Sequence, residues 1–127
     1  SLQWQDDADV SDTNNQKNWT EAIEYCEALS MAGQTDWRLP NANELLSIVD
    51  SSSYNPAINS EFINVSPSYY WSSTSRANDT SHAIDVSFLN TGVLSLNSVK
   101  SDENRYTRCV RDGDKTTMAP IIMYLLN

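Results

Sequence analysis

The two cysteines are the residues whose positions say most about chemistry. Cys26 falls on the apolar stripe of a predicted helix, and Cys109 lies in the last predicted strand. If that strand packs beneath the helix, a disulfide would close a loop of roughly 80 residues and stabilise the fold by about 4–5 kcal/mol on the chain-entropy estimate. Two buried free thiols are the alternative. Because the pair is not in a CxxC arrangement, we expect a structural disulfide, and with it an oxidising compartment: periplasm, cell surface or medium.

The sequence carries little that could support catalysis. His82 is the single histidine, so no second histidine offers an alternative base, and it shares strand parity with the apolar Ile84 and Val86. No serine lies in a Gly-x-Ser-x-Gly motif, and three glycines leave no phosphate-binding loop. We therefore expect that the protein is not an enzyme.

An acidic segment near the N-terminus could bind calcium. Asp7, Asp9 and Asp12 lie close together in sequence, and carboxylates are the hard oxygen ligands that calcium prefers. The segment lacks the central glycine and closing glutamate of an EF-hand, and the chain lacks the Glu-Pro-Asn and Trp-Asn-Asp motifs of calcium-dependent lectins. The alternative is a solvated acidic loop. We expect no other cofactor.

Tyrosines around a Ser-, Asn- and Pro-rich stretch are the best candidates for ligand binding. Tyr54, Tyr69 and Tyr70 flank this stretch, and tyrosine with serine and asparagine makes an adaptable recognition surface. We place a binding surface for a glycan or a surface protein on residues 51–68 and 74–81, although both segments could instead be packing loops. The candidates in the second segment are Arg76, Asn78 and Asp79.

The overall charge limits the partners. Eight Lys and Arg against seventeen Asp and Glu give a net charge of −9, and the only basic cluster is Arg105, Arg108 and Arg111. Nucleic acids, anionic membranes and sulfated polysaccharides attract basic surfaces, so we expect none of them as a partner. Membrane insertion is not expected either, because a span needs roughly 20 apolar residues and the apolar run at residues 118–126 is about half that long.

Two helices are predicted in the first half of the chain. Residues 18–32 carry apolar side chains at helical spacing, with Asn18 as N-cap and Glu21 completing a capping box. A second, shorter helix follows Asn41, with Glu44 in the same position relative to its cap. The Ser-, Asn- and Pro-rich stretch after this helix is predicted to be a long ordered loop.

The second half of the chain has the period of β-strands. Strands are predicted at residues 69–74, 82–89, 93–96 and 105–111, with a hairpin turn at residues 90–92. Helices early and an antiparallel meander late predict an α+β domain.

The whole chain, residues 1–127, is predicted to be one domain with an apolar tail at residues 116–127. If this apolar tail were exposed to solvent, it would favour aggregation. We expect it to add a strand near Leu2, Gln3 and Trp4. The alternative is that it docks onto a neighbouring domain or another subunit, which would make the protein a homo-oligomer.

Several segments together resemble a known family. They are LQWQDD from residue 2, Trp19 to Cys26, DWRLPN from residue 36, YNPAI from residue 54, YWSS from residue 70 and RCVR from residue 108. In combination they resemble the C-terminal domain family of the Legionella collagen-like protein, a bacterial family. The similarity covers nearly all of residues 2–111.

The resemblance implies a fold related to C-type lectins and to the formylglycine-generating enzymes. Such a fold has two helices packed on a small twisted antiparallel sheet, termini close together, and a helix cysteine bridged to the last strand. Members sit in secreted or surface proteins, and the named member adheres to glycosaminoglycans. We therefore expect an extracytoplasmic, non-catalytic ligand-binding or adhesion domain in a bacterium. The alternatives are a structural or oligomerising module of a larger surface protein and a formylglycine-generating-like enzyme.

Overall fold

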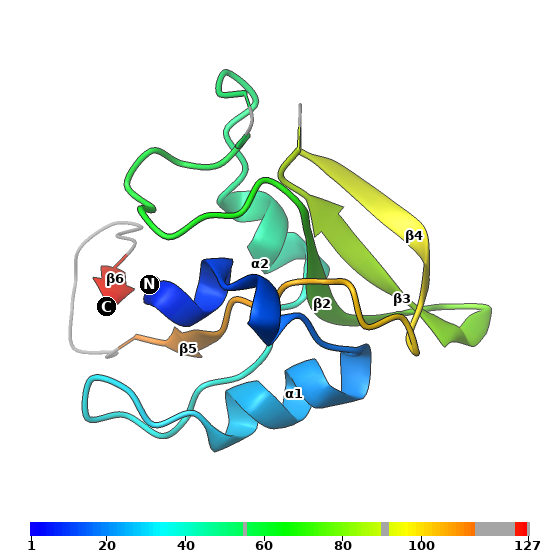
Figure 1. The fold of residues 1–127 in the computed structure, drawn as a ribbon, viewed down its shortest axis with the longest axis horizontal. Helices are drawn as coiled ribbons and strands as arrows, with labels where there is room; N and C mark the ends of the chain where they lie inside the picture. Colours follow the sequence, from blue (N-terminus) through cyan, green and yellow to red (C-terminus); the bar gives the residue numbers. More distant parts are fainter. Residues whose placement is uncertain (55, 90–91, 114–123, 127) are drawn as a thin grey trace.

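The computed structural model describes residues 1–54, 56–89, 92–113 and 124–126, with the backbone alone at residues 97 and 124–126 (Figure 1). It has the predicted α+β fold, in which two helices lie against two small sheets. The described elements in chain order are β1 (Leu2–Gln5), the 3₁₀ helices η1 (Ala8–Ser11) and η2 (Thr13–Asn15), α1 (Trp19–Ala28), α2 (Ala42–Ser47), β2 (Tyr69–Arg76), β3 (Asp79–Ser87), β4 (Val93–Val99), β5 (Val110–Asp112) and β6 (Tyr124–Leu126).

Helix α1 starts where its capping residues predict. The Asn18 side chain accepts a hydrogen bond from the backbone N–H of Glu21 (2.9 Å), and the Glu21 carboxylate accepts one from the N–H of Asn18 (3.0 Å). The helix ends at Ala28, earlier than predicted. Ala32 and Gly33 have positive φ angles of 54° and 74°, which a right-handed helix does not allow, so the chain turns here instead.

Helix α2 has the same capping box and is tied to the end of the domain. The Asn41 side chain accepts from the N–H of Glu44 (2.8 Å), while the Glu44 carboxylate accepts from the N–H of Asn41 (2.9 Å). Arg38 donates two further hydrogen bonds to Glu44 (2.7 and 2.8 Å) and one to Asp112 (2.9 Å) in β5. Because Arg38 bonds the charged carboxylate, the pKa of Glu44 is held below its usual range.

The first sheet brings the two ends of the chain together, in the strand order β5-β1-β6. Strand β1 pairs with β5 antiparallel, with Gln3 opposite Arg111, and with β6 in parallel, with Gln3 opposite Tyr124. The N-terminus accordingly lies beside β6 in Figure 1. The expectation of adjacent termini is confirmed. The predicted tail strand is confirmed for residues 124–126, and the rest of that segment, up to residue 123, lies outside the described residues.

The second sheet is an antiparallel meander in the order β2-β3-β4. Strand β3 begins at Asp79, earlier than predicted, because only two residues separate it from β2. Gly92, at the predicted turn after β3, has a φ of 72°, while residues 90 and 91 lie outside the described residues. The structure thus has two small sheets where one was expected.

The predicted strand over residues 105–111 changes partner along its length. Tyr106 donates its backbone N–H to the carbonyl of Tyr69 (2.9 Å) and accepts from the N–H of Trp71 (3.1 Å), both in β2. Val110 instead pairs with β1 and with the segment before α2. A segment that serves two sheets cannot stay in one ladder, so only β5 forms a regular strand.

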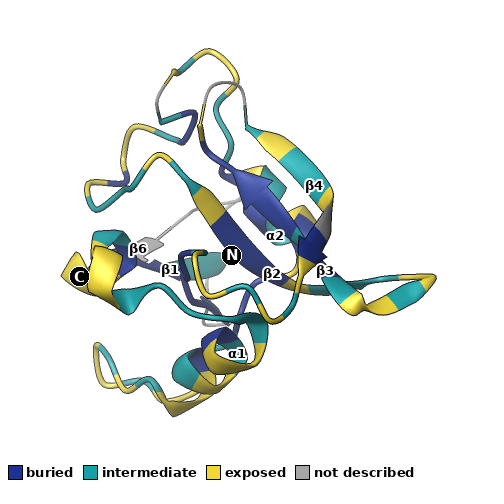
Figure 2. Cartoon of the chain, turned by 45° about the vertical axis from the view of Figure 1, so that its right-hand side comes forward, coloured by how far each residue is buried: buried dark blue, intermediate teal, exposed yellow. Residues whose placement is uncertain are grey.

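Two apolar clusters form the core, and the disulfide lies in one of them. Strands β2 and β3 carry long buried stretches, whereas β4 is mostly exposed or half-buried (Figure 2). Cys26 on α1 and Cys109 before β5 are bonded, with Cα atoms 5.5 Å apart, and both are fully buried. The predicted disulfide is confirmed, and the alternative of free thiols is wrong. Among the described residues, no helix is both long enough and apolar enough to span a bilayer.

Candidate functional site

The long loop between α2 and β2, residues 50–68, is ordered by hydrogen bonds to elements on either side of it. Ala57 donates its backbone N–H to the carbonyl of Phe88 (2.8 Å), and Asn59 donates to the carbonyl of Ile48 (2.9 Å). The loop side chains that are buried in the core are Ala57, Ile58 and Phe62. The prediction of an ordered loop is therefore confirmed for its described residues, 50–54 and 56–68.

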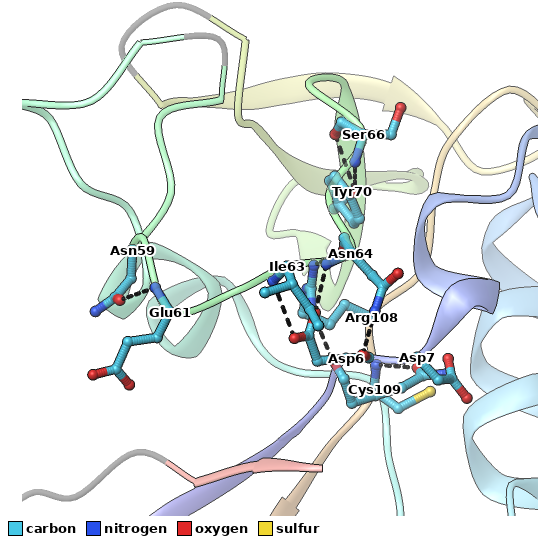
Figure 3. A network of polar contacts seen from close by, with 11 residues as sticks. Asp6, Asp7, Asn59, Glu61, Ile63, Asn64, Ser66, Tyr70, Arg108 and Cys109 are labelled. Carbon is cyan, nitrogen blue, oxygen red and sulfur yellow. Dashed lines mark hydrogen bonds and ion pairs between the residues drawn. The ribbon is translucent and has the colours of Figure 1, made fainter. Parts of the chain in front are cut away.

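A buried ion pair anchors the second half of this loop (Figure 3). The Arg108 guanidinium donates from Nη1 to Asp6 Oδ1 (3.2 Å) and to the Gln5 carbonyl (2.6 Å), and from Nη2 to the Asn64 carbonyl (2.6 Å). The Arg108 and Asp6 side chains are 0% and 1% exposed. Burial lowers the pKa of Arg108, while Tyr70 and Asp6 raise it, and a guanidinium stays protonated.

The Asp6 carboxylate holds the loop backbone directly. It accepts hydrogen bonds from the N–H groups of Ile63 (3.1 Å) and Asn64 (3.0 Å), and the Asn64 side-chain amide donates back to the Asp6 carbonyl (2.6 Å). A carboxylate inside a protein is tolerated only when it is paired and hydrogen-bonded, as this one is. The loop conformation at residues 63–64 and the burial of Asp6 therefore depend on each other.

Tyr70, which was predicted to bind ligand, is part of this support and not of the surface. Its side chain is fully buried, and its hydroxyl both accepts from the N–H of Ser66 (3.0 Å) and donates to the Ser66 carbonyl (3.0 Å). Burial raises the pKa of this phenol. The prediction for Tyr70 is wrong because neighbouring residues of a strand face opposite ways, so Tyr69 and Tyr70 cannot both point outward.

The outer side of the loop exposes large apolar side chains. Tyr54 is 70% exposed and Ile63 is 73% exposed, and Tyr69, at the start of β2, is 41% exposed. The structure thus keeps Tyr54 and Tyr69 as surface candidates. It adds Ile63, whose side chain is solvent-exposed although its backbone is fixed by the buried Asp6.

The other predicted binding residues lie at the far end of β2. Arg76 ends β2 opposite Asp79 at the start of β3, and Asn78 is in the turn between them. Seven residue steps along β2 separate Arg76 from Tyr69, a distance of roughly 20 Å at the usual strand rise. Residues 51–68 and 74–81 therefore do not form the single surface that was predicted, because a strand separates them (Figure 1).

The hairpin tip also holds a serine, a histidine and an aspartate in contact. Asp79 accepts from Ser81 Oγ (2.5 Å) and is 2.9 Å from His82 Nδ1, and Ser81 Oγ is 3.0 Å from the same Nδ1. In a catalytic triad the serine and the aspartate bond different ring nitrogens. Here both contacts are to one nitrogen, which is not the arrangement of a proton relay.

The acidic N-terminal segment does not form a group of converging carboxylates. Asp7 accepts from the Gln5 side chain (3.0 Å), Asp9 accepts from the hydroxyl of Tyr25 (2.9 Å), and Asp12 caps η2 by accepting from the N–H of Asn14 (2.9 Å). Across the part of the chain that the structure describes, no three His, Cys, Asp or Glu side chains are grouped to hold a metal ion. Each of the three predicted calcium ligands instead has a local partner.

Two arginines carry more of the site than sequence reasoning assigned to them. Arg108 anchors the loop, and Arg105 binds the buried Asp85 of β3 through Nε–Oδ2 (2.8 Å). Asp85 Oδ2 also accepts from Ser98 Oγ (2.5 Å), whereas its Oδ1 has no donor among the described residues. The available signal was the group of arginines in the predicted strand RYTRCVR (residues 105–111), because an arginine in a buried strand must find a carboxylate.

Comparison with known proteins identifies one family. The model described as the Lcl C-terminal domain matches residues 1–111. No curated protein and no solved structure matches the chain. The matched range contains the disulfide, the 50–68 loop and the Asp6–Arg108 pair, and it ends within β5.

Proposed function

The chain belongs to the Lcl C-terminal domain family, and we propose that it is a non-catalytic binding domain that works outside the cytoplasm of a bacterium. Its ligand is a glycan or a surface protein. The ligand contacts the outer side of the 50–68 loop, where Tyr54 and Ile63 are exposed, together with Tyr69 beside it.

The observation that carries this proposal is the buried support beneath an exposed loop. The Asp6–Arg108 pair is fully buried, yet four of its hydrogen bonds end on residues 63–64 of the loop. A loop that is already ordered loses little conformational entropy on binding, which favours affinity. Exposed aromatic and aliphatic side chains on such a loop are typical of interface anchors.

Three features support the non-catalytic, extracytoplasmic part of the proposal. Both cysteines are joined in the disulfide, so neither is available as a nucleophile. The contacts of His82 with Ser81 and Asp79 fall on one ring nitrogen. Disulfides of this kind persist in oxidising compartments.

We interpret the architecture as C-type-lectin-like. The two helices, the adjacent chain ends and the disulfide from α1 to the segment before β5 are compatible with that relationship. The net charge of −9 disfavours anionic polysaccharides, so we expect that this chain does not share the glycosaminoglycan ligand of the named family member.

Bead adhesion tests this proposal. Fluorescent beads coated with the domain are applied to printed glycans and to immobilised extracellular-matrix and bacterial surface proteins. We expect specific retention by at least one of them, reduced about tenfold or more in a Tyr54→Ala/Ile63→Ser variant because interface anchors carry most of the binding energy. The matched control is Glu27→Ala on the exposed side of α1. Equal retention of the loop variant, at an unchanged melting temperature, would contradict the proposal.

A second candidate function is assembly into a larger surface protein, and strand β4 favours it. Strand β4 is at the edge of its sheet, contains no charged residue or proline, and exposes Val93, Leu96 and Val99. Edge strands without such protection pair readily with other chains. Light scattering of the wild type and of Leu96→Lys measures the oligomeric state. A dimer or larger species of the wild type that the lysine disrupts would support assembly, and a monomer in both proteins would oppose it.

A further inference from the structure

The strand register places exposed and buried polar groups on one face of the second sheet. Two rows of directly paired residues run across strands β2, β3 and β4. The first row is Tyr69, Ser87 and Val93, and the second is Trp71, Asp85 and Ser95. Directly opposed residues of antiparallel strands point to the same side, and so do residues two apart along a strand. These six side chains therefore share one face, which we call the Tyr69 face.

Arg105 lies across this face and contacts all three strands. Its guanidinium carbon is 5.4 Å from the ring centroid of Tyr69 and 5.6 Å from that of Trp71, both in β2. Its nitrogens bond Asp85 in β3 (2.8 Å) and Ser98 in β4 (3.4 Å). The arginine thereby fixes the tyrosine ring from one side while the ring stays 41% exposed.

Polar groups that can form hydrogen bonds surround Arg105, and together with the arginine they carry a small net negative charge. Asp102 Oδ2 is 3.7 Å from Nη1, and the Asn104 side chain accepts a hydrogen bond from the same nitrogen. One arginine thus faces two carboxylates, those of Asp85 and Asp102. Asp85 is fully buried, and its Oδ1 lacks a donor among the described residues, which is rare for a buried carboxylate oxygen.

We propose that the Tyr69 face is a binding site for an uncharged sugar. A flat, half-exposed tyrosine ring offers an apolar platform to the C–H face of a pyranose, with a hydroxyl at its edge. The carboxylate of Asp102, the amide of Asn104 and the hydroxyl of Ser95 are hydrogen-bonding partners suited to sugar hydroxyls. Asp85 itself is 0% exposed and lies beneath the surface, so its part is to hold Arg105 in place and not to contact the sugar.

Charge decides against the two other ligand classes. An anionic sugar or an acidic peptide would meet the surplus carboxylate of the Tyr69 face and a protein of net charge −9. A cationic ligand would lie against Arg105, whose guanidinium occupies the centre of the face. An uncharged polyhydroxylated ligand avoids both repulsions and uses donors and acceptors together.

This inference adds one ligand class to the proposed function. It rests on that function in one respect, namely that the chain is a binding domain. The experiment uses the whole chain on a printed array of uncharged hexose and N-acetylhexosamine oligosaccharides, with heparin and hyaluronan as anionic probes. Sugars that are retained are then titrated by calorimetry. The binding of the wild type is compared with that of three variants, Tyr69→Ala, Tyr69→Phe and Asp102→Asn, and of the control Glu27→Ala. Each variant is required to have the same melting temperature as the wild type.

We expect at least one uncharged oligosaccharide to bind, with an affinity that changes little between about 0.05 and 0.5 M salt because no ion pair forms. Tyr69→Ala should weaken binding about tenfold or more, whereas Tyr69→Phe keeps the ring and stays within about threefold. Asp102→Asn should weaken binding by a smaller factor, and Glu27→Ala should have no effect.

Three results would overturn the inference: no retention of any uncharged sugar, unchanged binding by Tyr69→Ala, or binding confined to heparin and hyaluronan and lost at high salt. If the Tyr54→Ala/Ile63→Ser variant loses retention on a protein surface while no sugar binds, the inference fails and the proposed function stands. If neither sugars nor proteins retain the beads, both fail.

Discussion

The two ends of strand β2 carry the two segments that the sequence suggested for one binding surface, and the two segments are held in different ways. At the start of β2, the 50–68 loop is tied to Asp6 and Arg108, whose side chains are buried from solvent. At its end, the β2–β3 hairpin is held by Asp79, which contacts Ser81 and His82 at the surface. Both regions are adjacent to the same strand, but the loop lacks regular structure whereas the hairpin is regular strand apart from its two turn residues, Ala77 and Asn78.

The depth at which a polar contact is buried decides how much of the fold it can support. Removing one partner of a buried ion pair leaves a charge without solvent or counterion, whereas an exposed pair exchanges its contacts for water at little cost. The loop is therefore an integral part of the fold, and the hairpin tip is not. A rigid platform for recognition is expected at the first end of β2 only.

The largest effect is expected from Asp6→Ala. The substitution leaves Arg108 buried without its carboxylate and the N–H groups of Ile63 and Asn64 without an acceptor. The free energy of unfolding should fall by about 3–5 kcal/mol, measured by urea denaturation. Hydrogen exchange at the amides of Ile63 and Asn64 should accelerate more than exchange in β3. A loss below about 1 kcal/mol would show that the pair does not anchor the loop.

A smaller effect is expected from Tyr70→Phe, which removes one hydroxyl and keeps the ring in the core. The N–H and carbonyl of Ser66 lose their partner, so the unfolding free energy should fall by about 1–2 kcal/mol. Thermal and urea denaturation measure the change. Tyr69→Phe is the matched control, because among the described residues the fold needs no hydrogen bond from the Tyr69 hydroxyl. Equal losses of unfolding free energy in the two variants would argue against the support role of Tyr70.

Asp79→Ala should lower the free energy of unfolding far less than Asp6→Ala does, because exposed ion pairs contribute little. Urea denaturation beside Asp6→Ala gives a direct contrast between the two ends of β2. If Asp79→Ala is as damaging as Asp6→Ala, the distinction between a buried and an exposed support is wrong.

The finest test is the titration of Asp79. Hydrogen bonds from Ser81, with a smaller effect of His82, hold the pKa of this carboxyl below its usual range. A depressed pKa means that these contacts favour the folded hairpin above the usual carboxyl pKa and lose that effect as the pH falls through the lowered value. NMR titration of the wild type should show the low midpoint, and Ser81→Ala should raise it. An unchanged midpoint would mean that Ser81 is not the cause.

Much of the local structure followed from short-range patterns. The pairs Asn18–Glu21 and Asn41–Glu44 predicted both helix starts, because a capping box involves residues only three apart. Helix α1 was predicted to be too long because Leu29 leaves the helical conformation (φ −69°, ψ 128°), and leucine is not a residue type that signals a helix end. Two sheets were not foreseen, since the segment at residues 105–111 divides its pairing between β1 and β2, and no local pattern encodes that choice.

The exposure of two candidate residues could be predicted, but the arrangement of the candidate surface could not. Tyr54 and Tyr69 are exposed as expected, whereas Tyr70 is buried beside Phe88 and Tyr106. Strand parity could have separated Tyr69 from Tyr70, but it does not say which of them faces the core. The distance between the 50–68 loop and the hairpin tip could not be seen either, because it requires the length and direction of β2 in the folded sheet.

The helix starts, the α+β class, the family and the acidic character follow from the amino-acid sequence alone, since each depends on residue type and short-range spacing. The bond between Cys26 and Cys109, the contact of Asp6 with Arg108 and the position of Arg105 over Tyr69 are seen only in the folded chain. The reason is physical: burial and ion pairing arise between segments far apart in the chain, and their energies depend on which surfaces pack together and exclude water.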